Sequence, residues 1–303
     1  MSLNPSDEAR TLTERLVVPE PARRPSKPAM TMKRMLLHLL IIAFGIVMIY
    51  PLLWMVSSSV KPTSEIFSKP GLIPETFTLQ NYVDGWNAIG FPFALFLGNS
   101  FLIAIVSVVG NLISCTLAAY AFARLEFRFK KTLFAAMMAT LMLPFHVLLV
   151  PQYILFNNLG MVDTFWPLIL PKFLAVDTFF IFLAVQFIRS LPRSLDDAAA
   201  IDGCGPFAVF WRIILPLLGP ALAVTTAFTF IWTWNDFLTP LLYLTSRENF
   251  TVPLALNAFL DSEAQSQWGA MFAMSMLSLL PVFLIFLFAQ KYLVKGIATT
   301  GLK

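Results

Sequence analysis

Seven polar or amphipathic side chains stand within otherwise apolar stretches of this 303-residue chain, where they could form hydrogen bonds with a polar ligand. They are Asn111, Ser114, Asp177, Gln186, Trp232, Asn235 and Asp236. A ligand rich in hydroxyl groups, such as a carbohydrate, requires hydrogen-bonding groups of this kind together with aromatic faces. The same residue types also bond between packed helices, and a tryptophan near a helix end often anchors it at a membrane interface. Ligand binding and helix packing are therefore both open interpretations of this set.

The sequence lacks the residue patterns of common catalytic and metal sites. It contains no Gly-Lys dipeptide, which excludes a Walker A phosphate-binding loop, and it has neither a His-Glu-x-x-His nor a Gly-x-Ser-x-Gly pattern. Its two histidines, His38 and His146, and its two cysteines, Cys115 and Cys204, are far apart in the sequence. We therefore predict that the chain is not an enzyme, and that it binds no metal ion or cofactor and has no structural disulfide.

A polar loop, residues 194–216, interrupts the apolar pattern. Ser194 stands three residues before Asp197, which is the spacing of a helix capping box with Asp in place of Glu or Gln. An alanine run follows, and Gly203 and Pro206 come where a short helix would stop. We expect a short surface helix that ends in a left-handed turn at Gly203, and then an apolar helix. A displayed helix of this kind is typical of a segment that docks into a groove of a partner protein.

The rest of the chain is too apolar for a soluble protein. Hydrophobic residues make up 58% of it and charged residues 13%, against about 25% charged residues in soluble domains. A membrane-spanning helix needs about 20 apolar residues. Six segments reach this length: Met35–Val56, Leu95–Phe122, Thr132–Ile154, Thr164–Ile188, Leu217–Leu242 and Gly269–Leu293. We predict an all-α integral membrane protein with six transmembrane helices, with the polar loop between the fourth and the fifth.

The basic residues predict the orientation. Seventeen of the 21 Lys and Arg residues fall on the side that holds both chain ends, and four fall on the other side. Those four are Lys61, Lys69, Lys172 and Arg247. Because cytoplasmic loops are enriched in basic residues, we expect both termini in the cytoplasm, and the net charge of +4 does not indicate nucleic-acid binding. Residues 1–34, rich in Pro and Arg, are expected to form a disordered basic cytoplasmic tail, and residues 35–303 the membrane domain.

The polar loop resembles the EAA loop in the permeases of binding-protein-dependent ABC transporters. In that family's motif Glu-Ala-Ala is followed by three residues and Gly, then by nine residues and Ile, then by one residue and Leu-Pro. At these spacings this chain has Asp197, Ala198, Ala199, Gly203, Ile213, Leu215 and Pro216. The one departure is Asp197 in place of Glu. The resemblance implies that these residues, together with Asp202, form a coupling element whose short helix lodges in a cleft of an ATPase subunit.

From Tyr50 onward the chain resembles the maltose-type permeases of the carbohydrate-uptake family. Pro51–Trp54 is similar to the end of that family's first span, Ala118–Arg124 to its second span and Trp234–Phe237 to its fifth. The resemblance implies a permease subunit in the bacterial inner membrane that moves a sugar or oligosaccharide by alternating access. It implies as partners a second related permease subunit, two ATPase subunits that bind ATP and Mg, and an extracytoplasmic solute-binding protein.

A secondary transporter driven by an ion gradient is the alternative interpretation. Such proteins place ionisable groups near the middle of the bilayer. Asp177 and Asp236 are two carboxylates within predicted spans, and we expect no basic partner for them inside the membrane. A secondary transporter has no need of a coupling loop, so residues 194–216 favour the ABC permease.

Overall fold

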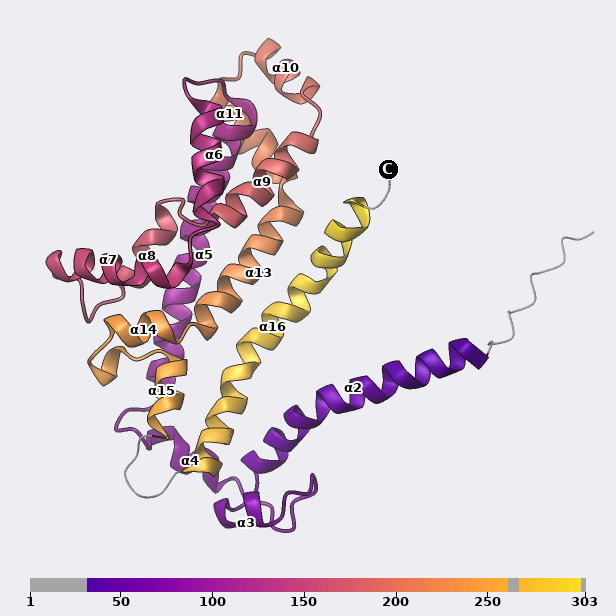
Figure 1. Ribbon diagram of the computed structural model, residues 1–303, viewed down its shortest axis with the longest axis vertical. Coiled ribbons are helices and arrows are strands. Elements are labelled where there is room, and N and C mark those ends of the chain that lie inside the picture. The colour runs from indigo at the N-terminus through magenta and orange to yellow at the C-terminus, as the bar shows by residue number, and fades with distance from the viewer. Residues whose placement is uncertain (1–31, 261–266, 301–303) are drawn as a thin grey trace, which may run out of the picture. The chain divides into compact units, whose positions relative to one another are not determined.

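The structure, a computed structural model, describes residues 32–260 and 267–300, and within these residues every regular element is a helix (Figure 1). The chain divides into two units, Met1–Pro51 and Leu52–Lys303, and we call the second unit the body. Most of the predicted tail lies outside the described residues. Its last three residues, 32–34, belong instead to the first turn of helix α2 (Met32–Ser59).

Long apolar helices account for most of the chain. Four helical segments are long and apolar enough to cross a membrane: Met32–Ser59, Phe93–Arg124, Trp166–Ser190 and Trp268–Lys291. Two pairs of helices pass the same test only together: Lys130–Thr140 with Phe145–Asn158, bent by 101°, and Pro206–Leu217 with Gly219–Asn235, bent by 77°. The six predicted spans are obtained if each bent pair is one span. The second and sixth are the helices α5 (Phe93–Arg124) and α16 (Trp268–Thr300).

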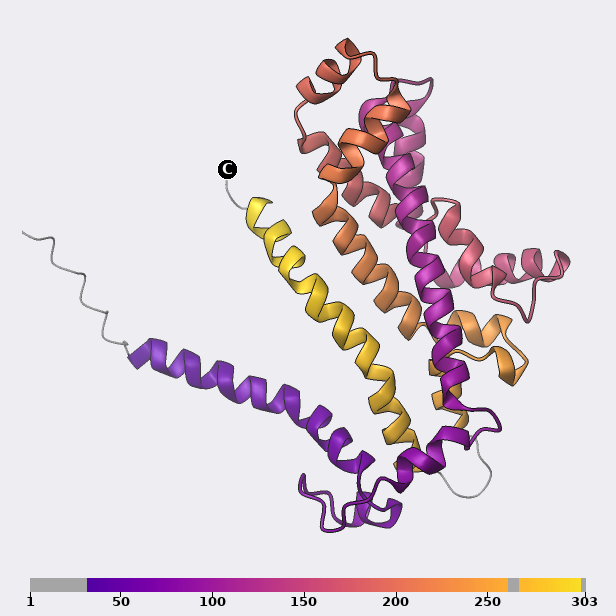
Figure 2. The ribbon, with the colours of Figure 1, turned by 180° about the vertical axis from the view of Figure 1, so that it is seen from behind.

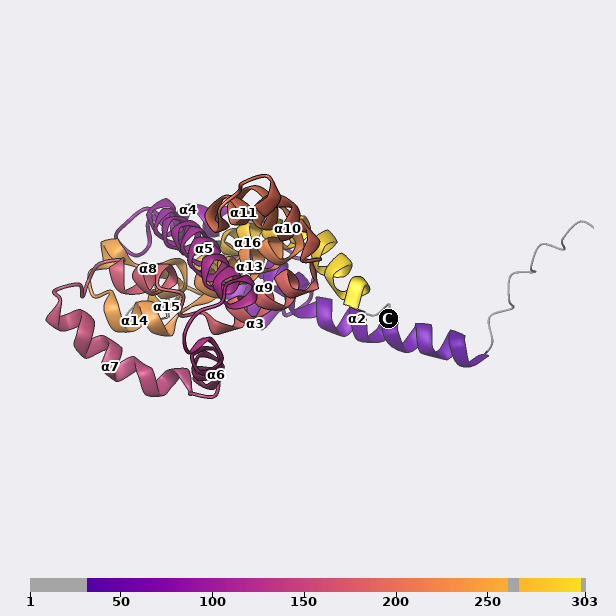
Figure 3. The same ribbon diagram turned by 90° about the horizontal axis from the view of Figure 1, so that it is seen from above.

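The predicted third span is not a continuous helix. It consists of α6 (Lys130–Thr140) and α7 (Phe145–Asn158), which lie on the flank of the body away from α16 (Figure 3). Pro144 stands at the start of α7. Proline has no amide hydrogen and disfavours the helical conformation of the residue before it, so the helix breaks there. Only Leu149 and Phe156 of α7 are buried, so most of this helix lies on the surface of the body.

The predicted fourth span is also broken. It consists of α8 (Trp166–Phe173) and α9 (Thr178–Ser190), and at the break Ala175 has a left-handed backbone with φ of 54°. Both helices pack against α5. Gly110 of α5 allows the approach of α8, because a Cβ atom at Gly110 would lie 2.7 Å from the ring of Phe173.

The predicted fifth span, Leu217–Leu242, is divided into shorter elements. Its main part is α13 (Gly219–Asn235), and α14 (Leu238–Tyr243) follows after Asp236. The chain enters α13 through α11 (Pro206–Val209), a π-helical turn η1 (Phe210–Ile214) and α12 (Leu215–Leu217). In η1 the Leu215 amide bonds to the Phe210 carbonyl, five residues back. Pro216 has no amide hydrogen for the next regular bond, which explains why a wide turn forms here.

Four short helices mark the two ends of the body. α10 (Ser194–Ile201) and α11 lie at one end, and α3 (Thr63–Ser68) and α4 (Gln80–Asn87) at the opposite end, in both views (Figures 1 and 2). The remaining elements are the 3-10 turn η2 (Arg247–Asn249) and α15 (Val252–Ala258). Between the ends α5 packs against α13, and α13 packs against α16. The long helices thus connect the loop of residues 194–216 to the opposite end of the body.

Candidate functional site

The predicted coupling helix is present as α10, but its start differs from the prediction. α10 begins at Ser194 itself, with Arg193 in the capping position and no side-chain cap. The expected capping box is therefore wrong. The amides of Asp196 and Asp197 donate instead to the Arg193 carbonyl, at 2.9 and 3.1 Å. A backbone oxygen is therefore the acceptor at this helix start, in place of the Ser194 hydroxyl. Asp197 is exposed in the first turn, where a negative charge is favoured by the helix dipole.

The end of α10 is as predicted. Gly203 has a left-handed backbone with φ of 77°. Its amide bonds to the Ala200 carbonyl at 3.1 Å, and the Cys204 amide bonds to the Ala199 carbonyl at 2.8 Å. These two bonds form a Schellman motif, which requires a residue that tolerates positive φ. Gly203 thereby turns the chain out of α10 towards Pro206.

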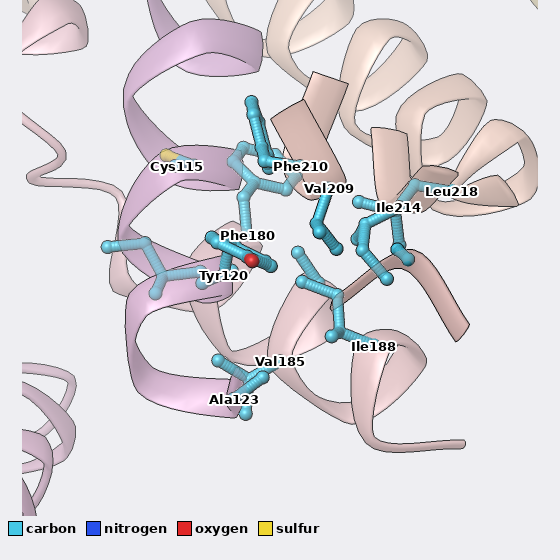
Figure 4. Packing of buried hydrophobic residues seen from close by; sticks show 14 residues of the cluster. Cys115, Tyr120, Ala123, Phe180, Val185, Ile188, Val209, Phe210, Ile214 and Leu218 are labelled. Carbon is cyan, nitrogen blue, oxygen red and sulfur yellow. The ribbon is translucent and has the colours of Figure 1, made fainter. Parts of the chain in front are cut away.

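A buried apolar cluster holds this loop against α5 and α9. Figure 4 shows side chains from the three parts of the chain packed together. Ala199 is buried in the cluster, and Ile213 and Leu215 pack against it. The Tyr120 hydroxyl of α5 also donates a hydrogen bond to the Pro206 carbonyl at 3.0 Å. Three of the predicted coupling residues thus attach the loop to the body.

The outer surface of the loop carries exposed side chains. Five predicted coupling residues are among them: Asp197, Ala198, Asp202, Gly203 and Pro216. Three large apolar side chains, which the sequence analysis did not single out, are also exposed: Ile201 at 87%, Phe207 at 70% and Trp211 at 43%. Apolar residues at the end of a polar surface helix were the signal that could have identified them. Exposed apolar groups beside exposed charges are typical of a protein-binding surface.

Four of the seven predicted ligand-path residues line one cavity of about 610 Å³, which we call the main cavity. They are Asp177, Trp232, Asn235 and Asp236. Lys172 and Gln152 also line it, and the sequence analysis did not assign either of them to the path. The volume lies within the range of small-molecule sites. Asp177 lies at the break between α8 and α9 and Asp236 at the break between α13 and α14, so both breaks border the cavity.

Asp177 has a basic partner, contrary to our expectation. Lys172 Nζ lies 2.9 Å from Asp177 Oδ2, and both residues belong to the apolar segment Trp166–Ser190. From the distribution of basic residues we expected Lys172 on the outer side of the membrane, whereas it lies within this apolar segment. The pair forms across the break between α8 and α9, where Ala175 has a left-handed backbone.

Asn111 and Ser114 form hydrogen bonds to neighbouring elements. Asn111 is fully buried in α5 and donates from Nδ2 to Asp177 Oδ2 and to Thr229 Oγ1 of α13. Ser114 Oγ donates to the Lys172 carbonyl at 2.7 Å. Gln186 is exposed on α9 and is not among the residues that line the main cavity. These three residues are thus not among those that line the main cavity, although Asn111 bonds to Asp177, which does.

Asn235 stands between two cavities. Besides the main cavity it lines a second one of about 480 Å³, together with Asn257, Ser275 and Ser278. The side-chain nitrogen of Asn235, Nδ2, donates to the Ile231 carbonyl at 2.8 Å. The neighbouring Asp236 accepts a hydrogen bond from the Thr239 amide at 3.2 Å, at the start of α14. Both residues thus stabilise the end of α13 while facing open space.

A carboxylate joins two loops of the body, the one between α7 and α8 and the one after α14. Asp163, between α7 and α8, has φ of 61° and accepts hydrogen bonds from the amides of Thr245 and Ser246, both at 2.9 Å, and from the Ser246 hydroxyl. Asn249 donates to the Asp163 carbonyl at 2.9 Å. The Ser246 hydroxyl and amide hold the pKa of Asp163 well below its usual range. We call this arrangement the Asp163 clamp.

A membrane protein with an exposed loop at one end and a polar cavity among broken spans has the structure of a transport subunit. The family described as binding-protein-dependent transport system inner membrane component matches residues 110–299. Since this is more than half of the chain, the protein belongs to that family. It is a permease subunit of an ABC transporter, a class in which separate subunits carry the ATPase. The ion-gradient alternative is not supported.

Individual relatives agree with this assignment. The chain is 34% identical to the probable ABC transporter permease protein YurM of Bacillus subtilis, over 84% of this chain and 83% of the relative. It is 33% identical to the arabinooligosaccharides transport system permease protein AraQ of Halalkalibacterium halodurans, over 84% and 91% of the two chains. It is 31% identical to the diacetylchitobiose uptake system permease protein NgcG of Streptomyces coelicolor, over 84% of each.

A solved structure shares the fold. The crystal structure of a bacterial ABC transporter involved in import of the acidic polysaccharide alginate contains a chain that superposes with a TM-score of 0.79. The match covers 88% of this chain and 98% of that chain at 20% sequence identity. The shared architecture therefore extends over nearly the whole of both molecules.

Proposed function

We propose that this chain is a permease subunit that imports a sugar or oligosaccharide across a bacterial inner membrane by alternating access. The observation that carries the proposal is the pairing of the exposed loop around α10 with the main cavity in one helical body. Relatives whose names state the transport of arabino-oligosaccharides and diacetylchitobiose support the substrate class. Gln152, Asn235 and the aromatic ring of Trp232 suit a hydroxyl-rich ligand.

In this proposal α10 docks into a groove of an ATPase subunit on the cytoplasmic side. The exposed Asp197, Ile201 and Phe207 supply one charge and two apolar anchors for such a groove. Both termini are then cytoplasmic, residues 1–34 form a cytoplasmic tail, and residues 35–303 form the permease domain. The basic residues of the loops support this orientation.

The complete transporter in this proposal contains this chain, a second related permease subunit and two ATPase subunits. ATP and Mg bind to the ATPase subunits, and a solute-binding protein delivers the sugar to the outer face. Family membership supports an assembly of this kind. Closure of the ATPase subunits moves α10, and the cluster beneath α10 passes the movement to α5 and α9.

The test compares two glycines of the same loop. Gly203 has positive φ, whereas Gly205 has φ of −73°, and a Cβ at either would meet nothing within 4 Å. Asp at Gly203 strains the left-handed turn by about 1 kcal/mol, which is too little to unfold the spans but enough to misplace α10. We expect Gly203→Asp to insert normally, to retain less ATPase and to lose sugar uptake, with Gly205→Asp as the matched control.

The measurements are the amount of ATPase that co-purifies with the tagged permease and the sugar-stimulated hydrolysis of ATP. Asp197→Lys, which opposes the helix dipole, should lower both. Wild-type ATPase retention and hydrolysis in Gly203→Asp and Asp197→Lys alike would contradict the assignment of this loop as the coupling element.

A further inference from the structure

The main cavity contains an ion pair, and the coupling role proposed for residues 194–216 does not account for it. Lys172 and Asp177 line the cavity, and their side chains are 27% and 25% exposed. Both lie within the apolar segment Trp166–Ser190. Charged side chains within membrane-spanning segments are costly, and they usually face a cavity through which a substrate or ion passes.

The pair retains hydrogen-bonding capacity towards the cavity. Asp177 Oδ2 accepts from both Lys172 Nζ and Asn111 Nδ2, and within the described part of the chain no donor reaches Oδ1. Lys172 Nζ uses one of its three N–H groups in the same interaction. A sugar hydroxyl is both a donor and an acceptor, so a hydroxyl can donate to Asp177 Oδ1 while its neighbour accepts from Lys172 Nζ.

An aromatic face lines the same cavity. Trp232 of α13 is 52% exposed. Phe180 and Phe228 hold its ring, with ring centroids at 5.3 and 5.5 Å. A ring fixed in this way offers a large apolar face at little cost in conformational freedom, which suits the C–H face of a sugar ring. The cavity therefore has the polar and the apolar side that recognition of a sugar requires.

We propose that Lys172, Asp177 and Trp232 form a subsite for one uncharged sugar ring. The inference rests on the proposed function and adds to it the class of sugar. Lys172 and Asp177 neutralise each other, and Asp236, which has no basic partner among the residues in the described ranges, adds a negative charge to the cavity wall. A carboxylated sugar is repelled there, whereas a neutral hydroxyl meets both signs of charge.

The test uses the assembled complex in lipid vesicles with the ATPase subunits and the solute-binding protein. Radiolabelled arabinotriose and diacetylchitobiose serve as uncharged probes, and an alginate trisaccharide serves as the acidic probe. Lys172→Met and Asp177→Asn should each raise the KM for the transported uncharged probe about tenfold, the loss expected from an unmade hydrogen bond in a cavity. Co-purification of the ATPase should stay at the wild-type level.

Two controls distinguish a subsite from a structural ion pair. Lys69→Met removes a lysine from the exposed pair with Glu75, outside the cavity, and should leave KM unchanged. The double variant Lys172→Met/Asp177→Leu replaces the pair by apolar groups, which often preserves stability. If the double variant transports as well as the wild type, the pair only supports the fold and the proposal is wrong.

The remaining outcomes also decide the matter. Trp232→Ala should raise KM for the same probe, and Trp232→Phe should restore part of the affinity. An alginate trisaccharide that competes as strongly as the uncharged probes would overturn the charge selectivity. If the wild-type complex retains no ATPase, the proposed function itself is contradicted. If the ATPase is retained normally but Lys172→Met and Asp177→Asn both leave KM unchanged, only the subsite is contradicted.

Discussion

Arg124, the last residue of α5, forms an ion pair with Asp196 in the first turn of α10, with 3.0 Å between Arg124 Nε and Asp196 Oδ2. The contact is electrostatic, since the two groups lack the alignment of a hydrogen bond. The Arg124 side chain is only 7% exposed, and its Nη2 donates to the Leu191 carbonyl at 3.0 Å. One guanidinium therefore connects α5, the chain before α10, and α10 itself.

We predict that this pair transmits movement between α10 and α5. Arg124→Gln removes the charge and leaves Asp196 without its partner, at a cost of about 1–3 kcal/mol. We expect normal retention of the ATPase, but roughly tenfold less sugar transported per ATP hydrolysed, measured in vesicles. Arg128→Gln, at an exposed arginine four residues further on, is the matched control.

The charge-exchanged double variant sharpens this prediction. Arg124→Asp combined with Asp196→Arg restores an ion pair in the opposite sense and should recover part of the lost coupling. Full coupling in Arg124→Gln would show that the apolar cluster beneath α10 suffices on its own.

The Asp163 clamp gives a prediction about local stability. Asp163→Asn removes the charge but tolerates the positive φ of this position, because asparagine adopts the left-handed conformation readily. We expect the amides of Thr245 and Ser246 to exchange their hydrogens about fivefold faster, since water weakens but does not abolish bonds to a partly exposed carboxylate. Hydrogen exchange followed by mass spectrometry measures this directly.

The same variant has a predictable dependence on pH. The pKa of folded Asp163 lies below the unfolded value of about 3.9, so the charged form stabilises the loop at every pH above that value. This stabilisation is lost as the pH falls through the folded pKa. The ratio of exchange rates between variant and wild type should therefore be constant from about pH 8 to about pH 5 and decrease below about pH 4. A ratio that grows on acidification would refute this assignment.

Gly110 is predicted to be necessary for the contact between α5 and α8. A Cβ there would lie 2.7 Å from the Phe173 ring and 3.1 Å from the Lys172 backbone, so α8 must shift to accept it. Gly110→Ala should lower stability by about 1–3 kcal/mol. Gly98→Ala, in the same helix with nothing within 4 Å, is the control. The measurement is the fraction of monodisperse complex that survives heating, and equal survival of the two variants would contradict the prediction.

The proposed orientation can be tested by cysteine labelling. In a Cys204→Ser background, Thr245→Cys should react with an impermeant maleimide in intact cells, and Ser190→Cys should react only after the membrane is opened. Both positions are exposed, so access depends on the side of the membrane alone. The opposite pattern would invert the topology.

The sequence predicted the positions of the spans well, because about 20 consecutive apolar residues leave few alternatives. It also predicted the left-handed turn at Gly203, where a glycine follows a helix-forming run and precedes a proline. In contrast, the capping box at Ser194 was wrong. The Ser194 spacing is compatible with a cap, but the backbone of Arg193 competes for the same amides, and no local pattern reveals which one bonds to them.

The main cavity was only partly predictable for a geometric reason. Lys172 and Asp177 are five residues apart, which in a continuous helix would place them about 140° apart around the axis. They meet because the chain breaks at Ala175, whose residue type gives no warning of a left-handed conformation. For Asn111 and Ser114 the ligand path stays a prediction: each bonds to a neighbouring element, and polar residues in spans look alike in sequence whether they face a neighbouring helix or open space.

Because of the wide turn η1, the number of residues in the loop matters independently of which residues they are. A π turn contains one residue more than an α turn, so deleting one residue between Phe210 and Ile214 would allow a regular helix. Everything before the deletion would then rotate by about 100° around the axis of the helical segment Pro206–Leu217, which is bent by 77° from α13. Phe210 would leave its place beside Tyr120, and α10 would point in another direction. Across related permeases, the number of residues between the motif glycine and the Leu-Pro pair should therefore vary less than the side chains of this segment outside the motif isoleucine.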